Sequence, residues 1–386
     1  MKNVLLVFGG LSYEHDISIV TASQIFNKTK LDDYKLIPLY ISKDGKYFVY
    51  RSNEFSISDF KCPDNLNKKK FTEVVFISSE KNIMFSKGKL GLKEYLKVNL
   101  AIFACHGGRG ENGGYVSVFE SYGIKSSAGN TDALGICMNK YLFKQTMIGL
   151  KIPAVYGMII TKFGYEKNKN TLLSKISKLK FPLVLKPNNG GSSIGLFIVT
   201  NADELDSKLA EAFEFDSEVI VEKFISVARE FNVAILGDRN CYEISEIDEP
   251  IKKHEILSFA DKYLSDDNSK FNKIDKSLKN SMASSVRKFP ADIDAELSLR
   301  IKKIAVKIFE SLNLRGVVRI DFLFDEKNGK LYVCEVNAIP GSLSFYFFSK
   351  NEILINNFTA KLIKIAENSK GLDEQINREF ITDIIK

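Results

Sequence analysis

The sequence predicts an α/β fold whose functional loops follow the carboxyl ends of parallel strands. Val4–Phe8 is an apolar run with the length of a buried strand, and Gly9-Gly10 ends it. Apolar residues then recur at helical spacing over Ile19–Phe26. A second apolar run, Leu100–Ala104, is also followed by a glycine pair, Gly107-Gly108. Strand, glycine turn and helix in this order are typical of parallel sheets that carry their sites at strand ends.

The composition is that of a globular protein larger than one hydrophobic core. The chain has 386 residues, of which 45% are hydrophobic and 27% charged, so two or three packed subdomains are expected. The net charge is +7, but basic residues are interspersed with acidic ones, and no nucleic-acid partner is expected. No apolar run approaches the ~20 residues of a membrane helix, and the N-terminal run is too short for a signal peptide. We therefore expect no membrane partner and a cytoplasmic location.

The cysteine spacing argues against a structural metal or a disulfide framework. The five cysteines contain no C-x-x-C pair. Cys105 and Cys334 lie in apolar runs, as buried free thiols do.

The first predicted domain covers residues 1–128, and it contains a further strand at Tyr34–Ile41. Residues 43–95 are rich in Lys, Phe and Ser and are interpreted as short strands and turns. They are expected to form an insertion into this domain or an elaboration of it.

The second predicted domain covers residues 129–223. Its expected helix lies around 140–150, and its strands lie at Val155–Ile160, Leu183–Lys186 and Glu218–Val221.

The third predicted domain covers residues 224–386. Its polar stretch 266–287 lacks periodicity and resembles a long loop, and an apolar stripe over Ile293–Leu312 predicts a helix. Its other expected elements are strands at Phe231–Leu236, Val317–Phe324 and Leu331–Asn337, and a helical tail after about Asn351.

The hairpin made by the last two strands gathers acidic side chains on one face. Arg319 and Asp321 are two residues apart and share a face, as do Glu335 and Asn337. A three-residue turn, Lys327–Gly329, would place Asp321 opposite Glu335, whereas a two-residue Asn-Gly turn would put them on opposite faces. Two carboxylates and an amide oxygen beside an arginine suit Mg²⁺ that holds a nucleotide triphosphate. The alternative is an exposed hairpin face with incidental charges.

The glycine-rich loop Asn188–Gly195 is a candidate phosphate site. Lys186 ends the preceding strand, and backbone N–H groups with the hydroxyls of Ser192 and Ser193 can then approach phosphate oxygens. The loop is neither a Walker A loop nor a G-x-G-x-x-G fingerprint. Taken alone it is more typical of a flexible connection, but the acidic hairpin downstream favours phosphate binding.

The segment Gly9–Asp16 lies at a predicted strand-to-helix junction. Helix N-terminal amides can hold an anionic group there, and Glu14 can neutralise a substrate ammonium. The alternative is that Glu14 and Asp16 are ordinary acids of a first helical turn. His106 is a candidate phosphate or substrate contact, although a lone histidine at a strand end is more often structural.

Short motifs occur along the chain in the order GGLSYEHDIS, HGGRGENG, MNK, FPLVLKPNNGGSSIG, VEKFI with ARE, DKYLSD, and RIDF with EVNAIPG. Over about residues 4–347 this series resembles the D-alanine–D-alanine ligase family of the ATP-grasp superfamily. The resemblance implies an ATP-grasp fold, in which an N-terminal Rossmann-like α/β domain precedes two α+β subdomains that clamp the nucleotide. It also implies an ATP-dependent carboxylate–amine ligase that forms D-alanyl-D-alanine through an acyl phosphate, for peptidoglycan synthesis.

The resemblance implies roles for individual residues. Nucleotide binding would involve Lys140, Lys186, Ser192, Ser193, Glu222, Lys223, Phe224, Ile225, Glu230 and Lys262. The metal ligands would be Asp321, Glu335 and Asn337, with two Mg²⁺ ions expected and Mn²⁺ as an alternative. Arg319 and the backbone of Gly341 would stabilise the oxyanion. Glu14, in a network with Ser192 and Tyr263, would anchor the first amino acid, and the protein would be a homodimer formed through its first domain.

Two departures from the family pattern concern the rest of the substrate site. Asn112 follows Glu111, where the family usually has another acid. After the Pro-Gly, the run Ser342–Phe347 places Tyr346 where the family commonly has a serine that holds the second substrate's carboxylate. The use of ATP is expected to be intact, whereas the sequence leaves the identity of the second substrate undecided.

Two other readings stay open beside D-alanine ligation. The first keeps the chemistry but changes the second substrate to another amino acid, a hydroxy acid or an amine, and Tyr263 favours an amine. The second is a non-catalytic ATP-binding regulatory protein, against which the complete set of phosphate and metal groups argues.

Overall fold

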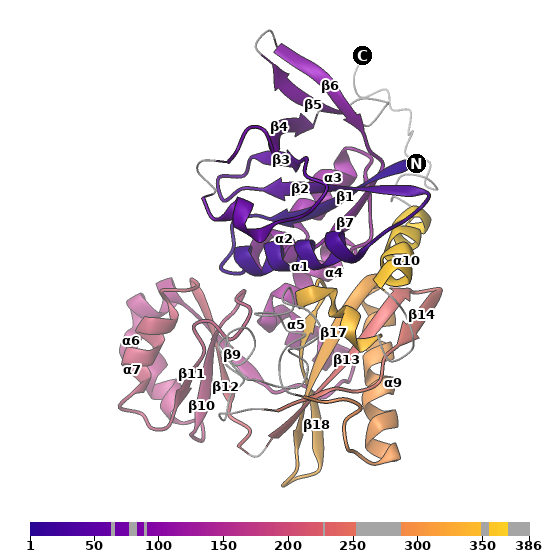
Figure 1. Cartoon of the computed structure of the whole chain (residues 1–386). Coiled ribbons are helices and arrows are strands. Elements are labelled where there is room, and N and C mark those ends of the chain that lie inside the picture. The colour runs from indigo at the N-terminus through magenta and orange to yellow at the C-terminus, as the bar shows by residue number, and fades with distance from the viewer. Residues whose placement is uncertain are drawn as a thin grey trace, which may run out of the picture.

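A mixed sheet of eight strands forms the N-terminal part of the chain, at the top of Figure 1. The computed structural model describes residues 1–62, 66–76, 83–88, 91–226, 228–251, 287–348 and 355–369. At the centre of the sheet, β1 (Lys2–Gly9) pairs in parallel with β2 (Tyr34–Ile41) and β7 (Leu100–Phe103). The outer strands are β3 (Tyr47–Tyr50), β4 (Phe71–Phe76), β5 (Ile83–Gly88), β6 (Gly91–Lys97) and β8 (Lys125–Ser126).

The predicted insertion is part of this sheet. Strands β3 to β6 continue it outward from β2 as antiparallel neighbours, so residues 43–95 lengthen one sheet edge. The helical elements of this part are α1 (His15–Lys28), η1 (Ile57–Phe60), α2 (Gly108–Glu111), α3 (Gly114–Ser121) and α4 (Thr131–Met138).

A second, antiparallel sheet has the strand order β11-β10-β12-β9 and lies at the lower left of Figure 1. Its strands are β9 (Gly157–Thr161), β10 (Leu183–Pro187), β11 (Phe197–Val199) and β12 (Glu218–Lys223), and its helices are α5 (Lys140–Gly149), α6 (Lys162–Ser177) and α7 (Leu205–Ala212). The sheet has a hydrophobic core of its own, whereas the first and third sheets share one continuous core.

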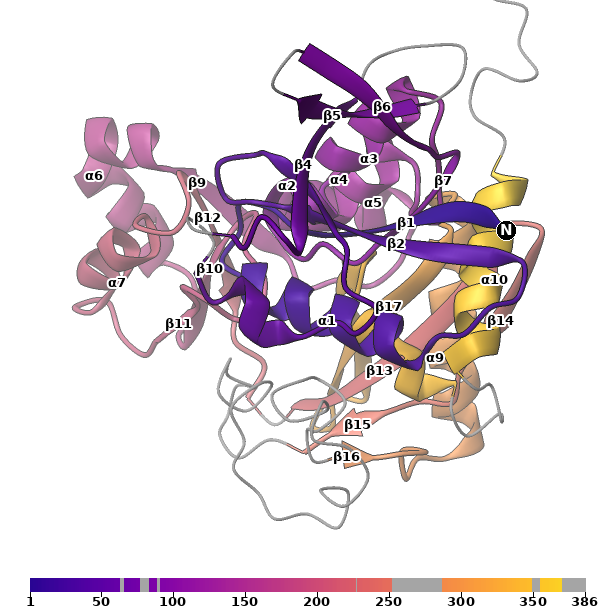
Figure 2. The same ribbon diagram turned by 45° about the horizontal axis from the view of Figure 1, so that its top comes forward.

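A third sheet, with the order β14-β13-β17-β18, completes the molecule. Helix α10 lies beside β7 and α1, which joins this part to the first sheet (Figures 1 and 2). The elements are β13 (Ala228–Asp238), β14 (Cys241–Ile244), β17 (Gly316–Asp325), β18 (Lys330–Asn337), α9 (Ala295–Ser311), η6 (Gly341–Phe347), α10 (Ile355–Asn368), and the small pair β15 (Glu249–Pro250) with β16 (Arg287–Lys288).

The predicted elements are present, with some changes in their limits. Helix α9 begins at Ala295, two residues after the expected start, because Asp294 caps it by accepting a hydrogen bond from the Leu297 N–H at 2.7 Å. Strand β9 begins at Gly157, two residues after the expected Val155. Helix α6 was not predicted, because its sequence is rich in Lys and Asn and shows no apolar stripe. Of the expected loop 266–287, all but its last residue lies outside the described residues.

The short segment η6 contains an uncommon backbone. Ser342, Leu343 and Ser344 have φ angles of 53°, 47° and 47°, in the left-handed region that side chains rarely adopt. All three are buried, and the Ser342 N–H donates to Thr21 Oγ1 of α1 at 3.1 Å. Packing against α1 therefore holds a backbone conformation that the local sequence alone disfavours.

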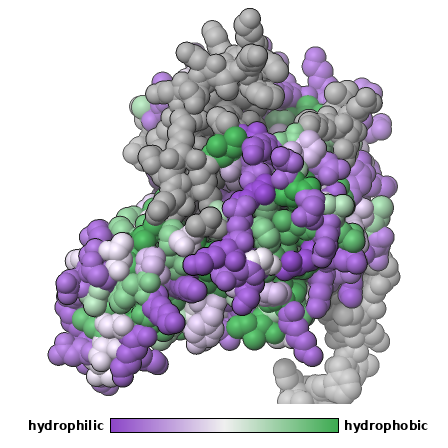
Figure 3. Space-filling view, turned by 90° about the horizontal axis from the view of Figure 1, so that it is seen from below, coloured by the Kyte–Doolittle hydropathy of each residue, from purple (hydrophilic) through white to green (hydrophobic). Residues whose placement is uncertain are grey.

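Over the described part of the face seen in Figure 3, hydrophilic and hydrophobic residues are interspersed. Within the described ranges, none of the helices combines the length and the apolar character that a membrane crossing needs.

Candidate active site

A cavity between the second and third sheets collects most of the predicted nucleotide residues. It encloses about 1120 Å³ of empty space, including its open mouth. Its lining includes Lys140, Lys186, Ser192, Ser193, Glu222, Lys223, Phe224, Ile225, Glu230, Arg319, Asp321 and Glu335. Lys262 and Tyr263 lie outside the described residues. Every predicted nucleotide residue that the structure describes thus faces one cavity.

The cationic side of the cavity is organised by Glu222 at the end of β12. Lys186 Nζ lies 2.9 Å from Glu222 Oε2, and Lys144 Nζ lies 3.0 Å from Glu222 Oε1. The Glu222 and Lys144 side chains are only 3% and 2% exposed, so this carboxylate is shared between two cations away from water. Burial would raise the pKa of Glu222, but Lys186 and Lys144 lower it, and Glu222 stays ionised.

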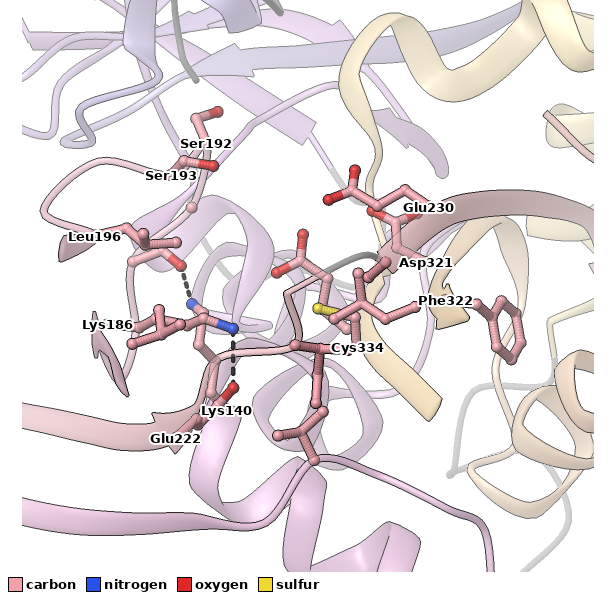
Figure 4. Close-up of a pocket in the computed structure, with 18 of the residues that line it drawn as sticks. Lys140, Lys186, Ser192, Ser193, Leu196, Glu222, Glu230, Asp321, Phe322 and Cys334 are labelled. Atoms are coloured by element: carbon pink, nitrogen blue, oxygen red, sulfur yellow. Dashed lines mark hydrogen bonds and ion pairs between the residues drawn. The ribbon is translucent and has the colours of Figure 1, made fainter. Parts of the chain in front are cut away.

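The two predicted phosphate lysines differ in their surroundings. Burial would lower the pKa of Lys186, but Glu222 raises it above its usual value. Burial lowers the pKa of Lys140, whose Nζ donates to the carbonyl oxygen of Gly190 in the glycine-rich loop. In Figure 4, Lys186 points at Glu222, while Ser192 and Ser193 lie across the cavity from Asp321 and Cys334. Lys144 was missed by the sequence reasoning, because a lysine within a helix is usually a surface residue.

The glycine-rich loop connects the cavity with the N-terminal motif. Ser192 Oγ donates to Glu14 Oε1, and Glu14 is only 8% exposed and makes no side-chain cap on α1. Gly191 lets the loop approach this closely, because a Cβ at that position would lie 2.6 Å from Glu14 Oε2 and the carboxylate would have to shift. The alternative of an ordinary first-turn acid therefore does not describe Glu14, although Asp16 is exposed as such an acid would be.

In the acidic hairpin the two acids pair as predicted, but the turn and the ladder that produce this pairing differ from the prediction. Asp321 pairs with Glu335, and Arg319 pairs with Asn337. The turn contains four residues, because Asp325 pairs with Lys330, and a bulge between Asp321 and Phe322 in the ladder then restores the register. The expected three-residue turn was therefore wrong. The extra residue of the bulge is Cys334, which lines the cavity and is only partly buried, contrary to the expected apolar burial.

Asp321 is held firmly in place. Arg319 Nε and Nη2 donate to its two oxygens at 2.7 Å each, and Asn337 Nδ2 donates to Oδ2 at 3.0 Å. Burial would lower the pKa of Arg319, but Asp321 raises it well above its usual value. The Arg319 side chain is 6% exposed, so the incidental exposed face proposed as the alternative is excluded for this residue. Across the described ranges, no group of three His, Cys, Asp or Glu side chains has a metal-binding arrangement, and the candidate set depends on the amide of Asn337.

A smaller cavity of about 400 Å³ adjoins the first at Ser192, Arg319 and Glu335. Glu14, His106, Glu111, Asn337 and Gly341 also line it. His106 is 3% exposed; its Nδ1 lies 2.9 Å from Ile339 O and its Nε2 lies 2.8 Å from Thr21 Oγ1. Burial lowers the pKa of His106 to about 4, which keeps the ring neutral. These contacts favour the structural alternative for His106, whose substrate contact stays a prediction.

Glu111 is the second residue that the sequence reasoning did not assign to the site. Burial and the neighbouring Glu14 raise its pKa to about 8. Its Oε2 accepts a hydrogen bond from the Gly107 N–H at 3.1 Å. The only available signal was its place in the HGGRGENG motif, since its burial depends on the packing of α2 against α3 and α4.

The raised pKa of Glu111 predicts a pH-dependent stability. The folded protein binds the proton of Glu111 more tightly than the unfolded chain does, so proton binding adds to the free energy of unfolding. This contribution is fully present below pH ~4.5 and is lost as the pH rises through about 8. Between pH 6 and pH 9, the Tm of Glu111→Gln should therefore fall less than the Tm of the wild type, by roughly 1–2 °C. Both are measured in protein free of nucleotide and metal. Glu211→Gln, on the exposed surface of α7, is the control. Equal Tm losses in all three proteins would contradict the assignment.

Tyr346 lies in η6 and does not appear in the lining of either cavity. Its hydroxyl nevertheless contributes, after Asp321, to the raised pKa of Arg319. The guanidinium carbon of Arg287 lies 4.4 Å from the centroid of the Tyr346 ring. Tyr346 thus packs against Arg287 and lines neither cavity.

Comparisons with known proteins show which family and fold the chain matches. Residues 3–127 match the protein family described as D-ala D-ala ligase N-terminus, and residues 146–353 match that described as D-ala D-ala ligase C-terminus. A D-alanine–D-alanine ligase from Thermosipho melanesiensis is 32% identical and aligns over 100% of this chain and 99% of its own length. One from Thermosipho africanus is 33% identical over 95% of this chain and 93% of its own. A solved D-Ala:D-Ser ligase from Enterococcus faecalis has a TM-score of 0.75 and 25% identity, and covers 95% of this chain and 99% of that chain.

Proposed function

The chain belongs to the D-alanine–D-alanine ligase family, and we propose that it joins two molecules of D-alanine while converting ATP to ADP and phosphate. The family is one of ATP-dependent ligases, and the fold is that of its solved members. The observation that carries the proposal is that the Lys186–Glu222 pair and the Asp321–Glu335 pair line the same cavity. Phosphate-binding cations and metal-binding oxygens are the two requirements of phosphoryl transfer from ATP.

The oxygen donors of the hairpin fit a divalent metal. Asp321 and Glu335 are directly paired and Asn337 contacts Asp321, so hard oxygen ligands converge at one end of the cavity. Asp321 Oδ2 accepts hydrogen bonds from both Arg319 and Asn337, so a metal ion would replace the Asn337 N–H donor there and take the amide oxygen of Asn337 in its stead. We propose that Asp321, Glu335 and Asn337 hold Mg²⁺, two ions in all, with Mn²⁺ as a substitute. Bound there, the metal would neutralise charge on the phosphate oxygens.

The proposed mechanism begins with the first amino acid. Glu14 holds the ammonium group of this amino acid. The carboxylate of the amino acid then attacks the γ-phosphate of ATP, which gives an acyl phosphate and ADP. Lys140 and Lys186 supply positive charge to the phosphate oxygens, and Glu222 fixes the position of Lys186. Phe224 and Ile225 border the adenine, and Glu230 binds the ribose. Ser193 of the glycine-rich loop contacts the phosphate oxygens.

The amine of the second amino acid then attacks the acyl phosphate. Arg319 and the Gly341 backbone N–H donate to the oxyanion that forms, and phosphate leaves as the peptide bond closes. Because an acyl phosphate hydrolyses readily, the glycine-rich loop must exclude water, and the Ser192–Glu14 hydrogen bond closes it over the first substrate. We further propose that Lys262 contacts the transferred phosphate and that Tyr263 joins the Glu14 network.

The test is phosphate release from ATP with D-alanine as the only amino acid, with the dipeptide identified by mass spectrometry. We expect both products in a one-to-one ratio. If they form only when a different amino acid, hydroxy acid or amine is added, the second substrate is not D-alanine. If no such compound supports phosphate release, the non-catalytic reading replaces this proposal.

Three further proposals accompany the activity. The domains divide at about 1–128, 129–223 and 224–386, a division that the three larger sheets support. The protein forms a homodimer through its first domain, and it works in the cytoplasm on material for the cell wall. Light scattering that gives the mass of a single chain would contradict the dimer.

A further inference from the structure

Asn188, the first residue of the glycine-rich loop, is completely buried, at 0% exposure, and is hydrogen-bonded on two sides. Its side-chain Oδ1 accepts from the Tyr141 N–H at 2.9 Å, and its Nδ2 donates to Glu218 Oε2 at 2.8 Å. Its backbone carbonyl accepts from the Lys140 N–H at 3.0 Å, and its backbone N–H donates to Glu218 O at 2.9 Å. Both the side chain and the backbone of Asn188 therefore join helix α5 to strand β12.

The beginning of α5 depends on this asparagine. The first N–H groups of a helix have no partner within the helix and need one elsewhere. In α5, the N–H groups of the first two residues, Lys140 and Tyr141, both donate to Asn188. The backbone of Lys140 is thus held by a residue that lies far along the chain but only two positions after Lys186.

Asn188 thereby connects the two lysines that are proposed to bind the phosphates of ATP. Lys140 begins α5 and Lys186 lies on β10, so two different elements bring them into one cavity (Figure 4). Their like charges repel each other there, and a firm link between the two elements opposes their separation. Lys140 Nζ also donates to the carbonyl oxygen of Gly190. Helix α5 therefore holds the loop at its base through Asn188 and further along through Lys140.

We propose that Asn188 is a positioning residue that sets the spacing of Lys140 and Lys186 for the phosphates of ATP. Asparagine suits this place because its amide accepts from a helix N–H and donates to a carboxylate at the same time, which an ionised aspartate cannot do. Among the described residues that line the cavity Asn188 is not included, so it acts on the nucleotide through the two lysines. This inference rests on the proposed use of ATP.

The test reverses the direction of the hydrogen bond between Asn188 and Glu218. Asn188→Asp keeps the acceptor for the Tyr141 N–H but places a second carboxylate against Glu218. Adding Glu218→Gln restores the link, because the glutamine amide can donate to the new aspartate. The control is Asn201→Asp on the exposed surface of the same domain. Asn201 also accepts from backbone N–H groups, at 3.0 and 3.2 Å, and also donates to a carboxylate, Glu204 Oε1 at 2.8 Å.

Full-length proteins are compared by the Kd of a non-hydrolysable ATP analogue with Mg²⁺, by the KM of ATP and by the KM of D-alanine. For Asn188→Asp we expect the Kd and KM of the nucleotide to rise roughly tenfold, because a buried hydrogen bond is replaced by repulsion. The KM of D-alanine should change by less than about twofold. With Glu218→Gln added, the nucleotide Kd should return to within about threefold of the wild type. Asn201→Asp should bind the analogue as the wild type does.

A purely structural role would lower the Tm of Asn188→Asp and leave the nucleotide Kd of the folded protein unchanged, and this result would overturn the inference. A double variant that binds the analogue no better than Asn188→Asp would overturn it as well. Should Asn188→Asp fold poorly, Asn188→Ser breaks the link to Glu218 without adding a charge, and its nucleotide Kd decides in the same way. A wild type that binds no ATP analogue would instead refute the proposed use of ATP, so the two failures are distinguishable.

Discussion

Asp321→Asn and Glu335→Gln are each expected to lower ATP-dependent phosphate release by roughly 10³-fold, the largest loss of activity predicted for this protein. Both replacements keep the shape of the side chain and remove one negative charge from the cavity. Asp321→Asn also removes the bidentate partner of Arg319, whose two donors lie 2.7 Å from the carboxylate. Initial rates at saturating ATP and D-alanine, measured over a series of Mg²⁺ concentrations, provide the comparison.

The matched control is Asp325→Asn, at the C-terminal end of the same strand. Asp325 accepts hydrogen bonds from Asn328 in the turn and lines neither cavity. This variant should keep its kcat. If Asp321→Asn and Glu335→Gln retained wild-type rates as well, the assignment of the metal to the hairpin would be wrong.

Glu222→Gln is expected to have the largest effect on stability. The replacement leaves Lys144 and Lys186 buried without a counter-charge, at a cost of about 3 kcal/mol, which should lower the Tm by roughly 5 °C. The KM for ATP should also rise, because Lys186 loses the carboxylate that holds its Nζ at 2.9 Å. Thermal unfolding and ATP titration of the rate measure the two effects.

A double-mutant cycle with Lys144→Met and Glu222→Gln measures how strongly Lys144, rather than Lys186, is coupled to Glu222. Lys144→Met alone leaves Glu222 paired with Lys186 and should change the Tm little. Combined with Glu222→Gln it should recover part of the lost Tm, since one unpaired cation is then absent. Lys208→Met, in an exposed pair with Glu211, is the surface control. Strictly additive losses in the cycle would show that Lys144 and Glu222 are not coupled.

The first sheet illustrates what local patterns can predict. The strands at Val4–Phe8 and Tyr34–Ile41 and the helix after Gly10 were predictable, because apolar runs and helical spacing directly reflect burial in a parallel sheet. The continuation of that sheet by β3 to β6 was not, because edge strands with mixed polarity give the same pattern as surface loops.

The site was predicted from its motifs more than from its geometry. The pairing of Asp321 with Glu335 was predicted correctly, but from a three-residue turn that the structure does not have. The turn has one more residue, and a bulge at Cys334 compensates for it. Lys144 and Arg287 had no sequence signal, since their burial depends on residues far along the chain. Glu14 was ambiguous by itself, and the glycine-rich loop that reaches it across the structure gives its carboxylate a hydrogen bond from Ser192.

The left-handed turn at Ser342–Ser344 has a consequence for how the enzyme comes to be active. Its conformation costs roughly 1–2 kcal/mol per residue and depends on Thr21, which precedes it by more than three hundred positions. The backbone of Gly341, which begins this segment, therefore acquires its geometry only after segments from the N-terminal and C-terminal parts of the chain have met. A ribosome must therefore release the chain as far as Ser344 before this turn can form, and a severed C-terminal half would lack the Thr21 contact that holds it.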